Sequence, residues 1–326
     1  MSKPLRLLAD IGGTNARFAL CDEFTVHDER QLRCADYPDI EDAVAYYLQS
    51  VGERRHVEEA ALAIAAPLSS DLVGMTNHSW RFSVSGLRQK LKWRRLMVLN
   101  DFTALALAIR HLPEHELRQV GGTKHASEAP IALIGAGTGL GVSGLIHAGS
   151  EQWLPLQGEG GHVTLAPGND REAAVLRQLW RRFDHVSAER ALSGPGLVNL
   201  YTALCELDGA PVQLHQAADV TERGLNESCP QCTEALEMFC GLLGSVAGNL
   251  VLTLGATHAV YVGGGIVPRL GEQFTRSTFR RRFESKGRFV EYLRPVPVYV
   301  INSAQPAFVG LAHSFSSPGA RIESLG

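Results

Sequence analysis

Two glycine-rich turns, each flanked by apolar segments, are the parts of this chain best suited to hold phosphate groups. The first lies in LLADIGGTNARFALC (residues 7–21) and the second in IALIGAGTGLGVSGLI (residues 131–146). Each pattern predicts a β-hairpin whose tip exposes successive backbone N–H groups, and glycine lets an anion approach them closely. Gly12 and Gly13 are expected to supply the positive φ of a primed hairpin turn.

The two turns differ in one charged residue. Asp10 stands directly before the first tip, whereas the second tip is uncharged and offers the hydroxyl of Thr138. The first tip could therefore hold a hydrated Mg²⁺ beside a phosphate, while the second wraps the phosphates themselves. Together they predict a pair of domains that uses ATP.

The second turn also invites comparison with the dinucleotide-binding fingerprint GxGxxG. The position of the third glycine is occupied by Leu140, and the following VSGLIHAG is strand-like. The fingerprint requires a helix there, because the helix N-terminus holds the pyrophosphate. A dehydrogenase with a dinucleotide-binding domain is therefore the weaker alternative.

Asn100 and Asp101 follow a predicted strand (RLMVLN, residues 95–100) and begin a predicted helix. Ligands gather at such carboxyl edges of α/β sheets. One interpretation is that Asp101 merely caps the helix. The other is that the helix N-terminus keeps its carboxylate ionised, as a general base for a hydroxyl requires.

Further polar residues have the chemistry of a polyol site. Sugar hydroxyls both donate and accept hydrogen bonds, which suits the carboxylates of Glu159 and Glu189 and the imidazole of His162. Glu159 is expected in a core-facing stretch where no packing role explains it. Alone, His162 could be a structural histidine and Glu189 a surface acid of a helix, so the interpretation rests on their joint presence with Asn100 and Asp101.

A third glycine turn, Gly263-Gly264-Gly265-Ile266, follows the apolar segment AVYV. Bare backbone at this place would let an adenine or ribose lie against it. A plain left-handed turn after a strand explains the glycines almost as well.

Composition excludes several classes of protein. At 326 residues the chain exceeds one typical core, so two domains are expected. A net charge of −3 gives no general attraction to nucleic acid or to anionic membranes. Residues 241–265 are apolar, but Asn249, His258 and Gly255 interrupt them, which predicts a buried helix followed by a core strand. Cys229 and Cys232 form a CxxC without partners for a zinc site.

Strands and helices are expected to alternate along the chain, which indicates the α/β class. Strands are predicted within 5–35, 60–67, 95–100, 131–146, 259–263 and 295–302, with Pro67 ending the second of these. Helices are predicted at 39–51, 85–92, from Asp101 onward, through most of 170–253 and near the C-terminus. The two hairpin-first halves suggest an ancient duplication.

These segments resemble the bacterial glucokinases of the group that lacks the ROK signature. The resemblance covers nearly the whole chain and is carried by DIGGTNARFALCD, MTNHSW, NDFTA, GAGTGLG, GEGGHV, HVSAERALSGPGLVNLY and GGGIVPR, in this order. It implies the two-domain actin-like ATPase (ribonuclease H-like) fold, with a cleft between the domains. The implied small α/β domain comprises residues 1–111 plus 303–326, and the large one comprises 112–302 with a helical insertion.

The resemblance also implies ATP-dependent phosphorylation of the glucose 6-hydroxyl, the entry to glycolysis. Asp101 would be the general base, and glucose would be bound by Asn100, Asp101, Glu159, His162 and Glu189. Neither Glu159 nor Glu189 is expected to face the nucleotide. Mg-ATP would be held by Ala9, Asp10, Ile11, Gly12, Gly13, Thr14, Asn15, Gly135, Gly137, Thr138, Gly139, Gly141, Gly263, Gly264, Gly265 and Ile266, with Asp10 reaching Mg²⁺ through water.

Related classes fit less well. ROK kinases resemble this chain in the phosphate hairpin but carry a cysteine-rich zinc motif, which GHVTLAPGND lacks. ROK repressors begin with a helix-turn-helix, which is not expected here. A kinase for another hexose such as mannose or fructose remains an alternative, and a non-catalytic sugar-binding protein is a more remote one. Family likeness suggests a cytoplasmic homodimer whose partners are small molecules, with no nucleic acid and no membrane.

Overall fold

Two compact units make up the fold. The computed structural model describes residues 4–52, 56–66, 68, 70–75, 78–123, 128–150, 152–317 and 322–324. The first unit combines Met1–Pro113, Leu145–Gln157 and Ser303–Gly326, and the second combines Glu114–Gly144 and Gly158–Asn302. Residues 145–157 thus group with the first unit, whereas the predicted division kept them in the large domain.

The first unit is built on a six-stranded mixed sheet with the order β14-β7-β4-β1-β2-β3. Its strands are β1 (Leu5–Ile11), β2 (Asn15–Asp22), β3 (Thr25–Arg33), β4 (Glu59–Ile64), β7 (Arg95–Asn100) and β14 (Ile322–Ser324). The first three form an antiparallel meander, and β4 and β7 continue the sheet parallel to β1. A separate antiparallel pair consists of β5 (Leu72–Gly74) and β6 (Arg81–Ser83).

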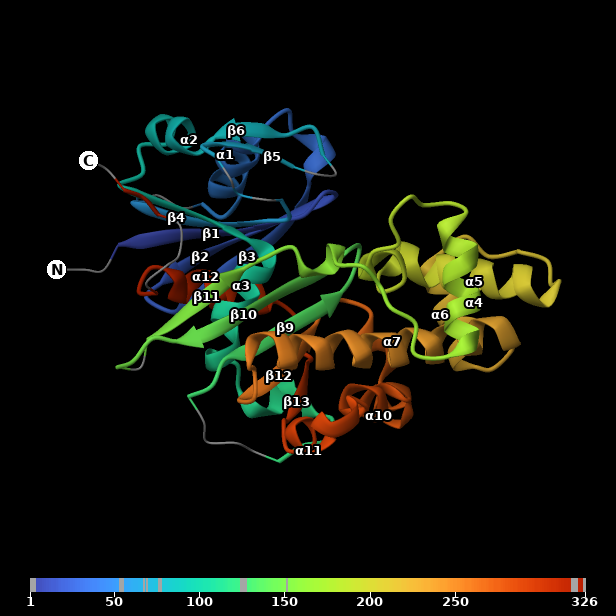
Figure 1. Cartoon of the computed structure of the whole chain (residues 1–326). Coiled ribbons are helices and arrows are strands. Elements are labelled where there is room, and N and C mark those ends of the chain that lie inside the picture. Colours follow the sequence, from blue (N-terminus) through green and yellow to red (C-terminus); the bar gives the residue numbers. More distant parts are fainter. Residues whose placement is uncertain are drawn as a thin grey trace. The chain divides into compact units, whose positions relative to one another are not determined.

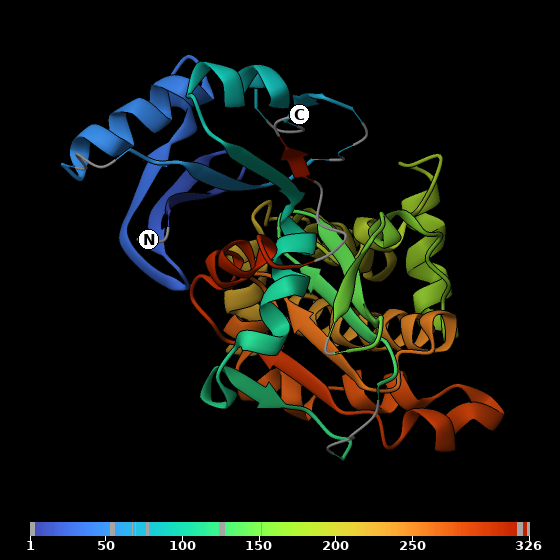
Figure 2. The ribbon, with the colours of Figure 1, turned by 90° about the vertical axis from the view of Figure 1, so that its left-hand side faces the viewer.

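Helices cover both faces of this sheet. Helices α1 (Ile40–Ser50) and α2 (Val84–Lys90) lie on one side, and α3 (Asp101–Ala108) and α12 (Pro306–Ser314) lie on the other (Figure 2). Because side chains alternate across a strand, Leu7 of β1 enters the core with α1 and α2. Asp10 has the opposite parity and lies on the face against which α12 packs.

The second unit repeats this arrangement. Its sheet has the order β11-β10-β9-β12-β13-β8, so a hairpin-first meander is again continued by two parallel strands. The strands are β8 (Leu117–Gln119), β9 (Ile131–Ala136), β10 (Leu140–His147), β11 (Trp153–Gln157), β12 (Ala259–Gly263) and β13 (Val298–Ile301). Strand β11 and the last residues of β10 belong to this sheet, although residues 145–157 group with the first unit. Five strands of each sheet therefore follow one order, whereas the sixth is the last strand of the chain in the first sheet (β14) and precedes the other five in the second (β8).

The helices of the second unit gather around one long buried helix, α7 (Pro230–Leu254), which runs along the sheet (Figure 1). The others are α4 (Asp170–Trp180), α5 (Gly194–Asp208), α6 (Ala217–Leu225), α8 (Val267–Leu270), α9 (Glu272–Arg276), α10 (Phe279–Glu284) and α11 (Val290–Leu293). Helix α7 is long and apolar enough to cross a membrane, but 72% of its most apolar window is buried inside the protein. It ends at Gly255, whose φ of +63° confirms the predicted helix end.

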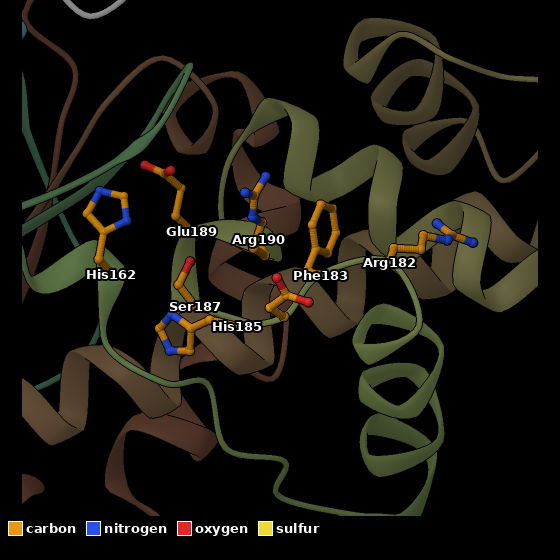
Figure 3. A pocket seen from close by; sticks show the side chains of 8 residues that line it. His162, Arg182, Phe183, His185, Ser187, Glu189 and Arg190 are labelled. Carbon is orange, nitrogen blue, oxygen red and sulfur yellow. The ribbon is translucent and has the colours of Figure 1, made fainter.

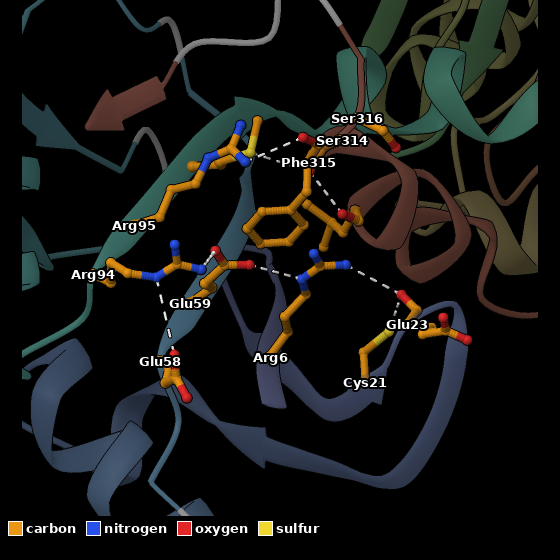
Figure 4. A network of polar contacts seen from close by, with 12 residues as sticks. Arg6, Cys21, Glu23, Glu58, Glu59, Arg94, Arg95, Ser314, Phe315 and Ser316 are labelled. Carbon is orange, nitrogen blue, oxygen red and sulfur yellow. Dashed lines mark hydrogen bonds and ion pairs between the residues drawn. The ribbon is translucent and has the colours of Figure 1, made fainter. Parts of the chain in front are cut away.

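A buried acid takes part in holding the C-terminal end of α12 against the first sheet (Figure 4). The carboxylate of Glu59 accepts hydrogen bonds from Arg94 and, at 2.9 Å, from Nε of Arg6. The Arg6 guanidinium lies 4.3 Å from the ring centroid of Phe315, and Nη1 of Arg95 donates to the Phe315 carbonyl at 3.1 Å. These cation–π and ionic contacts fix the end of α12 to strands β1, β4 and β7.

The predicted fold class is confirmed, and most predicted elements are present. Strand β14 was not predicted, because a short polar segment gives no alternating pattern. Thr76 and Asn77 of the MTNHSW motif, and Pro67, lie outside the described residues.

A stack of three rings joins α12 to the end of α3. The imidazole of His313 lies 4.3 Å from the ring of Phe24 and 3.4 Å from that of His111, with interplanar angles of 13° and 2°. Burial, assisted by the neighbouring His111, lowers the pKa of His313 to about 4. His313 is therefore uncharged in the folded protein at neutral pH.

This burial predicts sensitivity to acid. Between pH 6.5 and about 4, His313 is protonated in the unfolded chain and neutral in the folded chain. The free energy of unfolding therefore falls as the pH is lowered. His313→Phe should preserve the stack and lose less of its Tm between pH 7 and pH 5 than the wild type does. The exposed His115 provides a control, since His115→Phe should lose as much of its Tm between pH 7 and pH 5 as the wild type does. An equal loss of Tm in His313→Phe and the wild type would contradict this account.

Candidate active site

The first glycine turn joins β1 to β2 and is held by backbone hydrogen bonds. Gly12 N donates to the carbonyl of Asn15 at 3.0 Å, and the carbonyl of Thr14 accepts the N–H of Cys34 at 2.9 Å. Neither Gly12 nor Gly13 has a positive φ, so the predicted primed turn is wrong. Three residues rather than two connect the strands, and the longer connection reverses the chain without left-handed residues.

Asp10 lies beside this turn and is paired with an arginine. Asp10 and Arg17 are direct partners across β1 and β2, and Nη1 of Arg17 donates to Oδ2 of Asp10 at 3.1 Å. Nε of Arg17 also donates to Gln31 on β3 at 3.2 Å. Burial raises the pKa of Asp10, and the nearby Arg17 opposes that rise. The carboxylate is thus a desolvated group held by one cation.

The junction of β7 and α3 separates two roles that the sequence left open. Asn100 is the helix cap, since its Oδ1 accepts the N–H groups of Phe102 at 2.9 Å and Thr103 at 3.3 Å. Asp101 is the first helical residue, and its Oδ1 accepts from Phe102 N at 2.9 Å. The carboxylate therefore lies at the helix N-terminus without being its cap.

Asp10 and Asp101 belong to the same edge of the first sheet. Strands β1, β4 and β7 are parallel, and their registers align Ile11 with Ile64 and Ile64 with Asn100. Two strand spacings thus separate the ends of β1 and β7, roughly 10 Å. The first unit presents both carboxylates near its carboxyl edge.

The second glycine turn joins β9 to β10. Gly137 N donates to the carbonyl of Gly139 at 2.8 Å, and the carbonyl of Gly137 accepts the N–H of Gly194 at the same distance. Thr138 is exposed at the tip. Because a strand and not a helix follows, the dinucleotide fingerprint of a dehydrogenase is excluded.

The third glycine turn packs directly on this hairpin. Gly264 has a φ of +81°, and a Cβ on it would lie 2.3 Å from the carbonyl oxygen of Ala136. Ile266 N donates to the same carbonyl at 3.2 Å. The left-handed turn and the close backbone approach therefore both require glycine here, and the two predicted nucleotide segments Gly135–Gly141 and Gly263–Ile266 are brought together.

The GEGGH segment forms a short 3₁₀ helix, η4 (Gly160–His162), against β10. A Cβ on Gly161 would lie 2.0 Å from the carbonyl oxygen of Leu140, so only glycine fits. The side chains of Glu159 and His162 are 60% and 59% exposed, with Oε2 and Nε2 4.0 Å apart. The glycines, and not the acid, make the packing contact of this segment, which agrees with the expectation that Glu159 has no packing role.

Glu189 lies on the 3₁₀ helix η5 (Ala188–Arg190) and reaches the second glycine turn. Its Oε2 accepts the backbone N–H of Leu140 at 2.9 Å. Glu189 and His162 line one pocket of about 380 Å³ (Figure 3), together with Arg182, Phe183, Asp184, His185, Ser187 and Arg190. Glu189 therefore contacts the hairpin that is expected to bind phosphate.

The predicted site residues thus fall into two sets. Asp10, the Gly12–Asn15 turn, Asn100 and Asp101 belong to the first unit. Glu159, His162, Glu189 and the other two glycine turns belong to the second. Ala9 and Ile11 have fully buried side chains in the middle of the sheet, where β2 and β4 flank both.

Sequence reasoning missed two partners of the predicted residues. Arg17 could have been found from the hairpin register only if the turn had been predicted at its actual length, because a two-residue turn at Gly12-Gly13 would place Asn15 opposite Asp10. The N–H of Leu140 could not, because a backbone donor leaves no trace in the residue type.

Comparison with known proteins agrees with this geometry. The model of the glucokinase family matches residues 7–317. A glucokinase of Aromatoleum aromaticum is 53% identical over 309 residues, which cover 94% of this chain and 93% of that protein. The crystal structure of a glucokinase from an Antarctic psychrotroph is 34% identical and has a TM-score of 0.85, covering 95% of this chain and 98% of that one.

A more distant structure shares the fold alone. A ROK family glucokinase from Streptomyces griseus, solved in complex with glucose and AMPPNP, is 19% identical with a TM-score of 0.62 and covers 94% of this chain and 98% of its own. The family match and the relatives that span nearly the whole chain show that this chain belongs to the glucokinase family, in the group distinct from the ROK kinases.

Proposed function

We propose that this chain transfers the γ-phosphoryl group of ATP to the 6-hydroxyl of glucose, with Asp101 as the general base. The observation that carries the assignment of the base is the division of roles at the start of α3. Asn100 caps the helix, and Asp101 is its first residue, so the carboxylate lies at a helix N-terminus, where the helix dipole favours an anion such as a general base. Membership of the glucokinase family supports the substrate pair.

The three glycine turns are the proposed phosphate and nucleotide ligands. Their exposed backbone N–H groups suit phosphate oxygens, and phosphoryl transfer asks mainly for positioning and neutralisation of charge. In the first turn the proposed ligands are Gly12–Asn15 with Asp10. Ala9 is not among the proposed ligands, because its side chain is buried and β1 is paired on both sides.

Asp10 is the proposed contact to Mg²⁺, through water. A single carboxylate beside an exposed threonine, Thr14, suits an ion that keeps most of its own waters. When bound, Mg²⁺ neutralises charge on the transferred phosphates. Arg17 holds Asp10 in place and favours its ionised form.

Glucose is the proposed ligand of Asn100, Asp101, Glu159, His162 and Glu189. The high exposure of Glu159 and His162 suits groups that receive a ligand, since neither is used to hold the core. A kinase for another hexose is the alternative that uses the same residues. By family likeness we also propose a homodimer in the cytoplasm.

Replacing Asp101 tests the proposed base. Asp101→Asn keeps the shape and the hydrogen bond to Phe102 N but cannot accept the proton. We expect kcat to fall by about 10²-fold or more with little change in glucose affinity. Steady-state kinetics and direct glucose binding measure the two effects, and turnover near the wild-type rate would refute the role.

Replacing Asp10 should separate stability from metal use. Burial raises the pKa of Asp10, so the folded state favours the protonated carboxyl, and the resulting stability is lost as the pH rises through that pKa. Asp10→Asn, which mimics the protonated form, should therefore have a higher Tm at pH 7, with the gain shrinking toward about pH 4. Its Mg²⁺ requirement should rise. Full activity with an unchanged Mg²⁺ titration would remove Asp10 from the metal site.

A panel of hexoses tests the substrate. Buried or desolvated polar groups left unpaired by an inverted hydroxyl cost about 1–3 kcal/mol each, so glucose should exceed mannose and fructose in kcat/KM by about tenfold or more. Glu159→Gln should raise KM for glucose and leave KM for ATP nearly unchanged. If fructose had the highest kcat/KM of the panel, fructose would replace glucose as the proposed substrate. The absence of any sugar-dependent ADP release would refute the kinase proposal itself.

A further inference from the structure

We propose that Glu189 couples the binding of sugar to the binding of nucleotide. Its carboxylate accepts the N–H of Leu140 at the phosphate-binding hairpin. A sugar that takes the carboxylate would free this N–H for a phosphate oxygen. Glucose and nucleotide would then bind with positive cooperativity. This inference rests on the proposed function and adds a coupling role to one of its sugar ligands.

The contact between Glu189 and the hairpin is close and direct. Oε2 of Glu189 accepts from Leu140 N at 2.9 Å, and a Cβ built on the preceding Gly139 would lie 2.5 Å from the same oxygen. The carboxylate therefore lies against bare backbone at the first residue of β10. Gly139, directly before Leu140, is among the residues proposed to receive phosphate.

The segment that carries Glu189 is anchored, so the side chain is the part that can move. Oγ of Ser193 donates to the Glu189 carbonyl at 2.8 Å and accepts the N–H of Gly196 at 3.0 Å, which caps α5. A Cβ on Gly196 would lie 2.5 Å from the carbonyl carbon of Ala191. Gly194 N holds the carbonyl of Gly137 at the hairpin tip. The main chain of this segment is thus fixed to the hairpin at a second point.

Glu189 also faces the pocket where sugar is proposed to bind. It lines that pocket with His162, whose neighbour Gly161 packs on the carbonyl of Leu140 (Figure 3). A sugar hydroxyl can donate to a carboxylate and so replace the hydrogen bond from Leu140 N. One carboxylate therefore has two alternative donors, one on the hairpin and one on the ligand.

Charge gives the exchange its direction. A carboxylate on the hairpin repels an approaching phosphate and removes one of its donors. Moving that carboxylate to the sugar reduces both obstacles. Linkage requires the nucleotide to raise the affinity for glucose by the same factor.

The decisive variant is Glu189→Gln, which keeps the shape and can still accept from Leu140 N but carries no charge. The dissociation constant of AMPPNP is measured by calorimetry with Mg²⁺, with and without saturating glucose. In the wild type, saturating glucose should lower the dissociation constant of AMPPNP by about fivefold or more. In Glu189→Gln, AMPPNP should bind more tightly than in the wild type without sugar, and the effect of glucose should shrink, because the charge repulsion is absent.

A purely structural role predicts the opposite sign. If Glu189 only holds the hairpin in its working shape, Glu189→Gln should weaken AMPPNP in the absence of sugar, and this result would overturn the inference. Gly139→Ala provides a second variant, because the added Cβ must displace the carboxylate from Leu140 N. The ratio of AMPPNP affinities with and without glucose should shrink in it, and an unchanged ratio would also contradict the coupling.

Glu159→Gln is the matched control. Glu159 is another proposed sugar ligand, but its described ionic contact is to His162 and not to the hairpin. This variant should bind glucose more weakly, yet saturating glucose should lower its dissociation constant for AMPPNP by the same factor as in the wild type. Failure of the wild type to bind any hexose would instead overturn the proposed function. Normal glucose phosphorylation without coupling would overturn this inference alone.

Discussion

The peptide units on either side of Leu140 are the point on which the second unit's candidate site depends. The N–H of Leu140 is held by the carboxylate of Glu189, and its carbonyl is covered by Gly161, on which no side chain would fit. The two segments proposed to bind sugar therefore both rest on the first residue of the strand that follows the phosphate-binding turn. Because the backbone is closely packed here, a shift of either segment would also displace that turn.

The repeated topology explains why chemistry collects at corresponding places in the two sheets. In each, an antiparallel hairpin is followed by strands parallel to its first strand, so glycine turns and strand ends meet at the carboxyl edge. The halves differ in charge. The first unit places the carboxylates of Asp10 and Asp101 near this edge, whereas the corresponding turn of the second unit is itself uncharged and receives the carboxylate of Glu189.

Much of this could be predicted from sequence, because glycine turns between apolar strands and a polar pair between a strand and a helix leave clear patterns. The fold class, the strand after the second turn and the end of α7 were all predicted correctly. The conformation of Gly12 and Gly13 was not, because the same glycines serve a longer turn that needs no positive φ. The environments of Glu159 and Glu189 depend on backbone groups distant in sequence, which no residue type reveals.

The most direct test of this account is the amide resonance of Leu140 during a titration with glucose in the absence of nucleotide. Loss of a hydrogen bond to a carboxylate weakens the deshielding of the amide proton. We therefore predict that the Leu140 amide proton moves upfield as glucose binds, and that the shift is smaller in Glu189→Gln, whose neutral oxygen makes the weaker hydrogen bond. A Leu140 resonance that stays in place while glucose saturates the wild-type protein would contradict the account.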